Sequence, residues 1–312
     1  MRFLDNVLDR SVVFSFDRTG YQRHARGFND DHLKDVHGDR HIVITGGNSG
    51  IGFSAAMQCA QAGAAVTIIG RNPERTQAAA DSIRQHTHGQ ISWEVCDVSE
   101  LSSVRRLAQR LKPMDVLVHN AGDMIHRLEH TDDGIERITA THVVGPYVLM
   151  EALRSDGKLG GQRDARVIFV SSGGMYTQSL SVEGLHRFDK AYDGIRHYAL
   201  TKRAQVTLAD SLDRDADWSP RIRCASMHPG WVDTPALSRA MPTFKRITNA
   251  ILRTPSQGAD TIVWLALTAL RNWSSESRFY FDRRPSPAHL NKRTAQGGDA
   301  PDLLRTYLKQ FL

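Results

Sequence analysis

Short apolar runs alternate along the chain with longer amphipathic segments. After a polar lead-in of about forty residues, apolar runs of strand length occur at 41–45, 64–70, 91–95, 115–120, 166–172 and 221–230. The segments between them space their apolar residues as helices do. Short strands that are apolar on both faces and separated by helices predict a parallel sheet with right-handed crossovers. We therefore expect an α/β fold: a single Rossmann-type, doubly wound parallel sheet with helices on both faces.

The helical segments have recognisable starting signals. Asn72 followed by Pro73 is typical of an N-cap with proline in the first helical turn. Further helices are expected at 102–111, 136–153 and 198–214, and an amphipathic tail helix at 301–312. No linker or internal repeat interrupts the alternation. The predicted division is an N-terminal extension (1–40), the Rossmann-type domain (41–282) and a C-terminal extension with the tail helix (283–312).

Composition places the 312 residues among globular proteins, with 40% hydrophobic and 24% charged residues. No run of eighteen apolar residues predicts a membrane span. The N-terminus carries acidic residues within its apolar stretch, unlike a secretory signal. A weak amphipathic pattern at Phe3, Leu4, Val7 and Leu8 is compatible with peripheral membrane contact, but packing onto the body of the protein is favoured.

Cysteine usage and charge narrow the class further. Cys59, Cys96 and Cys224 are scattered and odd in number, which favours reduced thiols and a cytoplasmic location over a disulfide framework. None forms a CxxC pair, so no metal site is predicted. The net charge of +6 is diffuse, without a basic run interleaved with aromatic residues. A nucleic-acid partner is therefore not expected.

A glycine-rich turn, TGGNSGIG at 45–52, lies between the first strand and the following helix. In that position backbone N–H groups can approach a pyrophosphate, and the positive end of the helix faces it. Gly46 can make the turn, Gly50 lets a phosphate approach closely, and Gly52 lets the helix pack on the strand. The alternative is a glycine-rich loop without a ligand. The setting favours a dinucleotide site.

The end of the second strand predicts which dinucleotide is bound. An NAD(H) site usually has a carboxylate there, facing the adenosine ribose. This chain has Gly70 followed by Arg71, and a guanidinium pairs well with phosphate. NADP(H) is therefore favoured over NAD(H), unless Arg71 only lies in solvent at the end of the strand.

The stretch YALTK places Tyr198 and Lys202 one helical turn apart. A tyrosine with an ordinary pKa near 10 is a poor base at neutral pH, and a nearby cation would lower that pKa. By itself the pair is ambiguous, because an i, i+4 pair also arises on solvated helices. Its meaning depends on the rest of the chain.

Five motifs in order resemble the short-chain dehydrogenase/reductase family over residues 38–282: the glycine turn, HNAG, VSSGG, YALTK and HPGWVDTP. Several segments, GYQRHARGF and SMHPGWVDTPALSRAMPTF among them, resemble one subgroup of that family for which no substrate is firmly implied. The resemblance implies a Tyr198 that exchanges a proton with the substrate oxygen. It also implies a Lys202 that binds the nicotinamide ribose, and a Ser172, rather than Ser171, that holds the substrate oxygen. The cofactor contacts it implies, together with those read from the residues, are Gly46, Asn48, Ser49, Gly50, Ile51, Gly52, Arg71, Asp97, Val98, Asn120, Ala121, Gly122, Tyr198, Lys202, Pro229, Gly230, Val232 and Thr234.

One position departs from the family pattern. Where the family usually has an asparagine that holds a water in a proton relay to the lysine, this chain has His142. Imidazole can also hold a water or pass a proton, but it ordinarily titrates near pH 6.5. His142 is expected either to substitute for the asparagine, which we favour, or to weaken the relay. On the first reading, His142→Asn would keep or raise turnover and remove any activity inflection between pH 6 and 7.

Two other features bear on the site. The gap between Ser172 and Tyr198 is longer than is common in the family, and residues 176–195 are expected to form a loop along the edge of the substrate site. The stretch HRLEH at 126–130 matches a zinc-peptidase signature, but it lies where the α/β pattern needs a loop. His197 and His228 are expected to be structural or to support the site indirectly.

The substrate is less well defined by sequence. Apolar residues expected around the cleft are Met175, Tyr176, Trp231, Met241 and Phe244, unless several of them only pack a lid. The resulting hypothesis is an NADP(H)-dependent oxidoreductase that interconverts a small lipophilic carbonyl compound and its alcohol. The alternative is a dinucleotide-binding sensor or scaffold of the same fold with weakened catalysis. A homo-oligomer would be usual for the family, although long termini can cover its interfaces.

Overall fold

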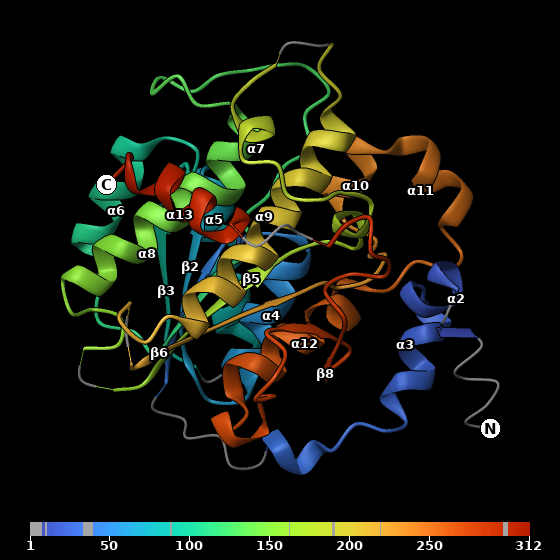
Figure 1. Cartoon of the computed structure of the whole chain (residues 1–312). Coiled ribbons are helices and arrows are strands. Elements are labelled where there is room, and N and C mark those ends of the chain that lie inside the picture. The colour runs from blue at the N-terminus through green and yellow to red at the C-terminus, as the bar shows by residue number, and fades with distance from the viewer. Residues whose placement is uncertain are drawn as a thin grey trace.

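The structure is a computed structural model that describes residues 8–9, 11–33, 40–87, 89–161, 163–188, 191–218, 220–295 and 299–312. The pattern at Phe3, Leu4 and Val7 lies outside these residues. Figure 1 shows a central sheet between two layers of helices. The α/β prediction is confirmed.

Within the described residues, the sheet has eight strands in the order β3-β2-β1-β4-β5-β6-β7-β8. All neighbours are parallel except the last pair, β7 and β8. All six predicted strands are present. The strands are β1 (His41–Thr45), β2 (Ala65–Gly70), β3 (Ile91–Val95), β4 (Val116–His119), β5 (Ala165–Val170), β6 (Ile222–Met227), β7 (Phe279–Phe281) and β8 (Arg284–Pro285). The short edge pair β7–β8 has no clear alternation in the sequence. The division at residue 282 stays a prediction.

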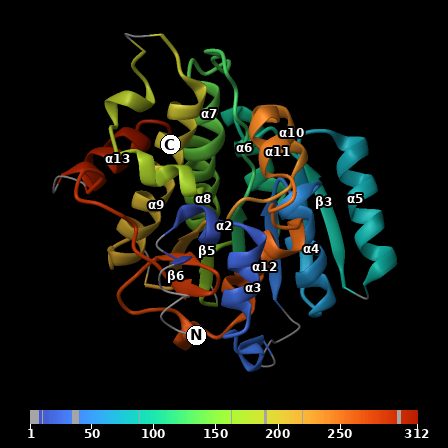
Figure 2. The same ribbon diagram turned by 90° about the vertical axis from the view of Figure 1, so that its right-hand side faces the viewer.

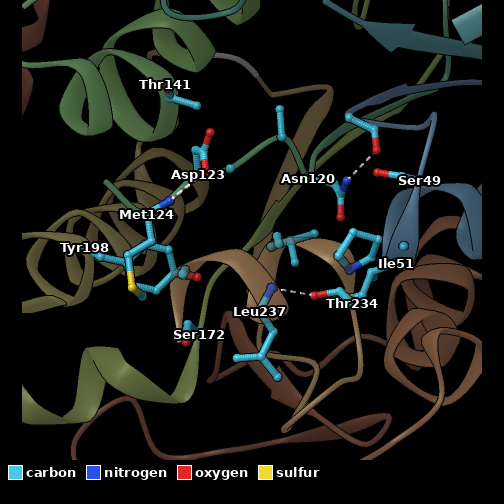
Figure 3. A pocket seen from close by; sticks show the side chains of 18 of the residues that line it. Ser49, Ile51, Asn120, Asp123, Met124, Thr141, Ser172, Tyr198, Thr234 and Leu237 are labelled. Carbon is cyan, nitrogen blue, oxygen red and sulfur yellow. Dashed lines mark hydrogen bonds between the residues drawn. The ribbon is translucent and has the colours of Figure 1, made fainter. Parts of the chain in front are cut away.

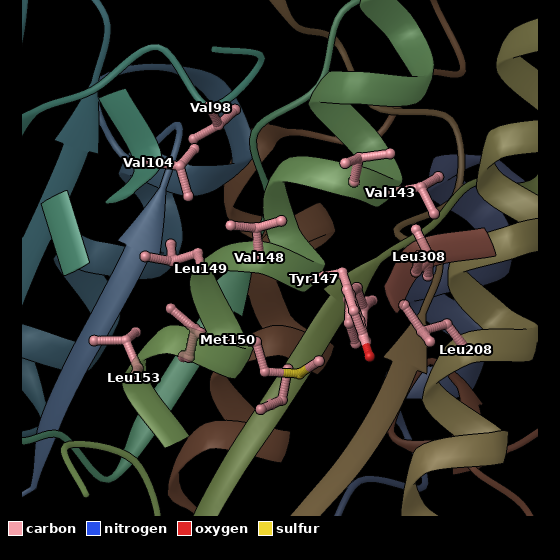
Figure 4. Close-up of a cluster of buried hydrophobic side chains, with 14 of the residues drawn as sticks. Val98, Val104, Val143, Tyr147, Val148, Leu149, Met150, Leu153, Leu208 and Leu308 are labelled. Carbon is pink, nitrogen blue, oxygen red and sulfur yellow. The ribbon is translucent and has the colours of Figure 1, made fainter. Parts of the chain in front are cut away.

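Each face of the sheet carries its own apolar core. One core packs α4 (Gly50–Gln61), α5 (Pro73–His86) and α12 (Pro255–Leu267) against the strands. The other packs α6 (Leu101–Arg110), α8 (Gly145–Ser155), α9 (Gly194–Arg214) and the tail helix α13 (Ala300–Lys309). Figure 4 shows part of this second core, with Leu308 of α13 close to Leu208 of α9. Burying both faces explains why the strand sequences are continuously apolar.

Local signals set the helix boundaries as expected. The Asn72 side chain accepts a hydrogen bond from the Arg75 N–H, which caps α5. The predicted helix at 136–153 is interrupted: α7 (Arg137–Thr139) continues into a π-helical turn, η2 (Ala140–Val144), before α8 begins at Gly145. Pro146 has no N–H to donate to the residue four positions earlier, so regular α-helical bonding cannot continue there.

The remaining elements lie at the edges of the sheet. The predicted polar lead-in contains α2 (Val12–Phe16) and α3 (Arg18–Ala25), which lie near α12 and β8 in Figure 1, and η1 (Asp30–Leu33). Figure 2 shows α10 (Pro235–Ala240) and α11 (Pro242–Thr248) above α4. Short helical turns complete the fold: η3 (Gly173–Thr177), η4 (Glu183–Leu185) and η5 (Leu270–Asn272).

Candidate active site

A cleft of about 1290 Å³ opens beyond the carboxyl ends of the strands. It lies where the strand order reverses between β1 and β4, the usual ligand position in open α/β sheets. Every residue predicted to bind cofactor lines this cleft except Gly52, and Ser172 lines it too. Gly52 and His142 are not among the residues that line the cleft. Figure 3 shows side chains from distant parts of the sequence, among them Ser49, Asn120, Ser172, Tyr198 and Thr234, around the same space.

The glycine turn between β1 and α4 has the geometry of a phosphate site. Gly46 and Gly50 have φ of +66° and +56°, a region that favours glycine. A Cβ on Gly52 would lie 2.4 Å from the Gly46 carbonyl oxygen, so this glycine permits close packing and needs no ligand contact. Ser49, the N-cap of α4, makes no side-chain cap bond. The first N–H groups of α4 therefore suit a pyrophosphate, and the residues present fit a dinucleotide.

Asn120 joins the ends of β1 and β4. Its Nδ2 donates to the carbonyls of Thr45 and Gly46 at 3.0 and 3.2 Å. The Thr45 hydroxyl accepts from the N–H groups of Asn120 and Ala121, both at 3.1 Å. Asn120 thus fixes the glycine turn through hydrogen bonds to its backbone. Thr45 also holds this junction, and sequence reasoning did not predict that role.

The adenosine end of the cleft is defined by charged side chains. Arg71 is 63% exposed, and its Nη2 lies 3.5 Å from the Asp123 carboxylate. Arg75 and Asn72 also line the cleft here. Asp97 accepts from the Ser99 hydroxyl at 2.7 Å, and its carboxylate lies 3.7 Å from the Arg137 guanidinium. Arg71 and Arg75 provide a setting for an anionic group at this end.

Ser172, Tyr198 and Lys202 converge in the cleft. The Ser172 side chain lies close enough to the Tyr198 phenol to affect its pKa, and the Lys202 Nζ lies 5.5 Å from the centroid of the Tyr198 ring. Ser171 points elsewhere: it is buried, and its hydroxyl donates to the Lys202 carbonyl at 2.8 Å. The structure therefore places the second serine, and not the first, beside the tyrosine.

Burial controls the ionisation of this group. It raises the pKa of Tyr198 to about 12, with the neighbouring Ser172 side chain acting in the opposite direction. Burial also lowers the pKa of Lys202 to about 7. The expectation that Lys202 brings the phenol pKa below its usual value is therefore not met in this geometry. The phenol is protonated at neutral pH and has a proton to donate.

His142 does not titrate as the sequence suggested. It is fully buried, and burial, together with the nearby charges of Lys202 and His197, holds its pKa well below 6.5. Its Nε2 accepts from the Asp123 N–H at 3.2 Å, and its Nδ1 lies 2.8 Å from the Thr201 hydroxyl, which donates to the Tyr198 carbonyl. The imidazole is thus neutral, with its proton on Nδ1. An inflection between pH 6 and 7 is therefore not expected from this imidazole, and the effect of His142→Asn on turnover stays a prediction.

The apolar end of the cleft agrees with the sequence in part. Trp231, Met241 and Phe244 line it, whereas Met175 and Tyr176 do not: they pack in a small cluster with Val206 and Phe279. Four residues from the two ends of the insert at 176–195, which was expected to edge the substrate site, also line the cleft: Thr177, Gln178, Asp193 and Ile195. The lining residues that sequence reasoning missed are Met124, Arg196, Leu237 and Arg239. No periodic pattern identified them, because such residues enter the cleft only through the tertiary fold.

The histidines flagged by sequence have other partners. The stretch 126–130 is a loop, as expected, and the His126 Nε2 lies 2.7 Å from the Ala240 carbonyl oxygen. No group of three or more metal-binding side chains occurs among the residues that the structure describes. His197 lies 2.7 Å from the Glu136 carboxylate, and His228 is buried between aromatic rings, stacking on Phe281 with centroids 4.1 Å apart. Within the described part of the chain, no helix is long and apolar enough to cross a membrane.

Comparison with known proteins identifies the family. The model of the short chain dehydrogenase family matches residues 40–243. Dehydrogenase/reductase SDR family member 12 of Bos taurus is 39% identical over 88% of this chain and 86% of its own length. Human polyprenol dehydrogenase is 30% identical over 74% of this chain and 73% of its own length. The crystal structure of an uncharacterised protein from Mycobacterium Paratuberculosis matches with a TM-score of 0.70 and 28% identity, covering 89% of this chain and 97% of that one.

The first of these relatives belongs to the subgroup that segments such as GYQRHARGF and SMHPGWVDTPALSRAMPTF resemble. The family match covers the glycine turn, Ser172, Tyr198 and Lys202, all of which line one cleft. The relatives are dehydrogenases and reductases by name. The chain therefore belongs to the short-chain dehydrogenase family of NAD(P)-dependent oxidoreductases.

Proposed function

We propose that the protein reduces a lipophilic carbonyl compound to its alcohol with NADPH. The observation that carries this proposal is the convergence of Ser172, Tyr198 and Lys202 in the cleft that the glycine turn also lines. When bound, the cofactor supplies the hydride that reduces the carbonyl carbon. The protein supplies binding, orientation and a proton.

In this proposal Ser172 and Tyr198 bind the carbonyl oxygen, and Tyr198 gives it the phenolic proton as negative charge develops. The raised pKa of Tyr198, which burial brings to about 12, keeps that proton available at neutral pH and supports reduction over the reverse direction. A charged Lys202 beside the ring stabilises the phenolate that remains. Oxidation of the alcohol would need the phenolate at the start, and is expected at higher pH.

The preference for NADP(H) is supported by Arg71 and Arg75 at the adenosine end. Neither arginine lies next to the carboxylate that NAD(H) sites usually have at the end of the second strand. Arg71 does form an ion pair with Asp123. The lipophilic substrate is supported by Met124, Leu237 and the aromatic residues at the other end, and by the name of human polyprenol dehydrogenase. The three buried free cysteines support a reducing, cytoplasmic location.

The test is cofactor oxidation measured over a panel of aldehydes, ketones, steroids and quinones, with NADPH and NADH in parallel, for the wild type and Tyr198→Phe. We expect NADPH-dependent reduction that falls at least ~100-fold in Tyr198→Phe, because the proton donor is lost. Unchanged rates in Tyr198→Phe would contradict the assignment. NADPH binding without reduction of any compound would favour the alternative, a dinucleotide-binding sensor or scaffold of the same fold.

A further inference from the structure

The buried side-chain amide of Gln205 connects Lys202 to η2, the turn that contains His142. Gln205 lies one helical turn after Lys202 on α9 and is fully buried. Its Oε1 accepts from the Lys202 Nζ at 3.1 Å, and its Nε2 donates to the His142 backbone carbonyl at 2.9 Å. The orientation of the amide follows from its partners, because an ammonium can only donate and a carbonyl can only accept.

The carbonyl of His142 lacks the donor that a regular α-helix would give it. Four residues later, where an α-helical N–H would donate to it, the chain has Pro146, which has no N–H. A buried carbonyl without a partner costs about 1–3 kcal/mol. The side chain of Gln205 supplies the missing donor, so its amide is held at both ends.

This arrangement restricts the ammonium of Lys202. Its Nζ also donates to the Val170 carbonyl at 2.8 Å, so two of its three N–H groups have fixed acceptors on the protein. The third remains for the cleft that Lys202 lines with Tyr198. Lys202 is 3% exposed, and in such a buried position the dipole of an amide oxygen favours the charged form.

We propose that Gln205 is a positioning residue of the active site, which holds the Lys202 ammonium charged and in one orientation beside Tyr198. In the family pattern, a water held by the residue at position 142 belongs to a proton relay that ends at the lysine. Here the Gln205 side chain on α9 connects the carbonyl of residue 142 to the Lys202 ammonium by hydrogen bonds. An amide N–H does not release its proton at neutral pH, so this link fixes the lysine without relaying a proton. The inference rests on the proposed function for the role of Lys202.

Among the described residues, the titratable groups facing Lys202 are few. Tyr198 is on its own helix, and its pKa is raised to about 12 by burial. His142 is on η2, and its pKa is well below 6.5. Behind His142, His197 lies 2.7 Å from the Glu136 carboxylate. Neither Tyr198 nor His142 changes charge between pH 6 and 9, so a titration of the Lys202 signal in that range reports the protonation of Lys202 itself.

The test is an NMR titration of protein labelled with ¹³C at lysine Cε, without cofactor, in which the Lys202 signal is the one missing from Lys202→Met. Gln205→Met keeps the volume but removes the acceptor, and we expect the Lys202 midpoint to fall by about one pH unit. Gln205→Glu replaces the amide by a carboxylate, and we expect the midpoint to rise by about one unit. Midpoints that stay at the wild-type value, or that move in the same direction in both variants, would overturn the proposal.

A matched control separates positioning from simple loss of stability. Leu212→Ala removes a buried side chain from the same helix, far along the chain from Lys202, and is expected to lower the melting temperature without moving the Lys202 midpoint. In carbonyl reduction, the apparent pKa of the alkaline limb in the pH profile of kcat/KM should fall by about one unit in Gln205→Met. At pH values above that pKa, this is a roughly tenfold loss of kcat/KM. If the NMR midpoints shift as expected while Tyr198→Phe keeps full activity, the proposed function fails and the role of Gln205 toward Lys202 stands.

Discussion

The two ends of the chain contact the same domain in different ways. The N-terminal segment (residues 11–29) packs behind loops that line the cleft, whereas the tail helix α13 packs on the outer side of α9. In Figure 1 they lie on opposite sides of the molecule. One is held mainly by polar and charged groups and the other mainly by leucines. We therefore expect changes in the first segment to affect the geometry of the site and changes in the second to affect only stability.

The polar contacts of the N-terminal segment centre on Arg253, which is fully buried. Its guanidinium donates to the carbonyls of Ser15, Asp17 and Pro229 at 2.9, 3.1 and 3.3 Å. It also forms a two-bond ion pair with Asp282 at 2.6 and 2.9 Å. One side chain therefore connects the N-terminal segment with a loop that lines the cleft.

Phe16 makes the second connection. Its carbonyl accepts from the Trp231 N–H at 2.9 Å. Its ring lies so close to Gly173, the residue after Ser172, that a Cβ there would be 2.6 Å from the ring. The N-terminal segment thus contacts both the Ser172 loop and the loop at 229–231. Neither contact is implied by the family motifs.

The tail helix makes a different kind of contact. Leu304 and Leu308 are fully buried in the core that includes α8 and α9. Tyr307 stacks on His186 with centroids 4.9 Å apart, and Arg305 pairs with Asp215 at 2.5 Å. None of these residues lines the cleft. The tail helix α13 therefore covers the outer side of α9.

The largest effect is expected from Arg253→Met, which would break the connection between the N-terminal segment and the cleft. It leaves the Asp282 carboxylate buried without its guanidinium partner, which costs about 3–5 kcal/mol. We expect carbonyl reduction by the folded protein to fall at least ~10-fold, because the loop at Pro229 loses its support. Steady-state kinetics well below the melting temperature measures this. The matched control is Arg283→Met, which breaks the ion pair with Asp260 at 2.6 Å; equal activity losses in the two variants would contradict the distinction between them.

A smaller change, confined to stability, is expected from Leu304→Ala in the tail helix. Removing a fully buried leucine costs about 2–5 kcal/mol, depending on how far the cavity collapses. Denaturant unfolding measures this loss. The kcat/KM of the folded variant should equal that of the wild type. A loss of activity without loss of stability would show that α13 acts on the cleft after all.

The smallest effect is expected from His24→Gln, and it depends on pH. The two ring nitrogens of His24 face Asp282 at 2.6 Å and Asp9 at 2.9 Å, so both must donate and the ring is an imidazolium. Burial alone would lower the pKa of His24, but the hydrogen bonds to these carboxylates outweigh it and raise the pKa above 6.5. The stabilisation is therefore complete below the unfolded pKa of 6.5 and is lost as the pH rises through the raised folded value.

Differential scanning fluorimetry of wild type and His24→Gln across pH 6 to 9 tests this. The wild type should melt on the order of 2 °C higher at pH 6, and the difference should shrink as the pH rises. A constant difference would show that His24 is held by packing alone. Leu304→Ala provides the contrast, because its melting temperature relative to wild type should not follow this trend.

Periodicity was enough to predict the body of the fold. The six parallel strands and the helices α5, α6, α9 and α13 appear where the sequence predicts them, because strands buried on both faces and amphipathic helices have distinctive local patterns. The interruption at η2 was missed, although Pro146 marks it. The edge strands β7 and β8 were missed as well, since runs of three and two residues carry no period.

The sequence pointed to the candidate site in two ways. The glycine turn was predicted from its position between strand and helix and from its backbone conformation. Ser172, Tyr198 and Lys202 were predicted through the resemblance to the short-chain dehydrogenase/reductase family, because the Tyr–Lys pair alone is ambiguous. Only the tertiary structure determined the burial, the hydrogen-bond partners and the pKa values of the residues in the site. The low pKa of His142, the bond between Gln205 and Lys202, and the placement of Phe16 behind Ser172 depend on burial and on partners distant in sequence. Desolvation and hydrogen bonding are set by the whole fold, so no local pattern could give them.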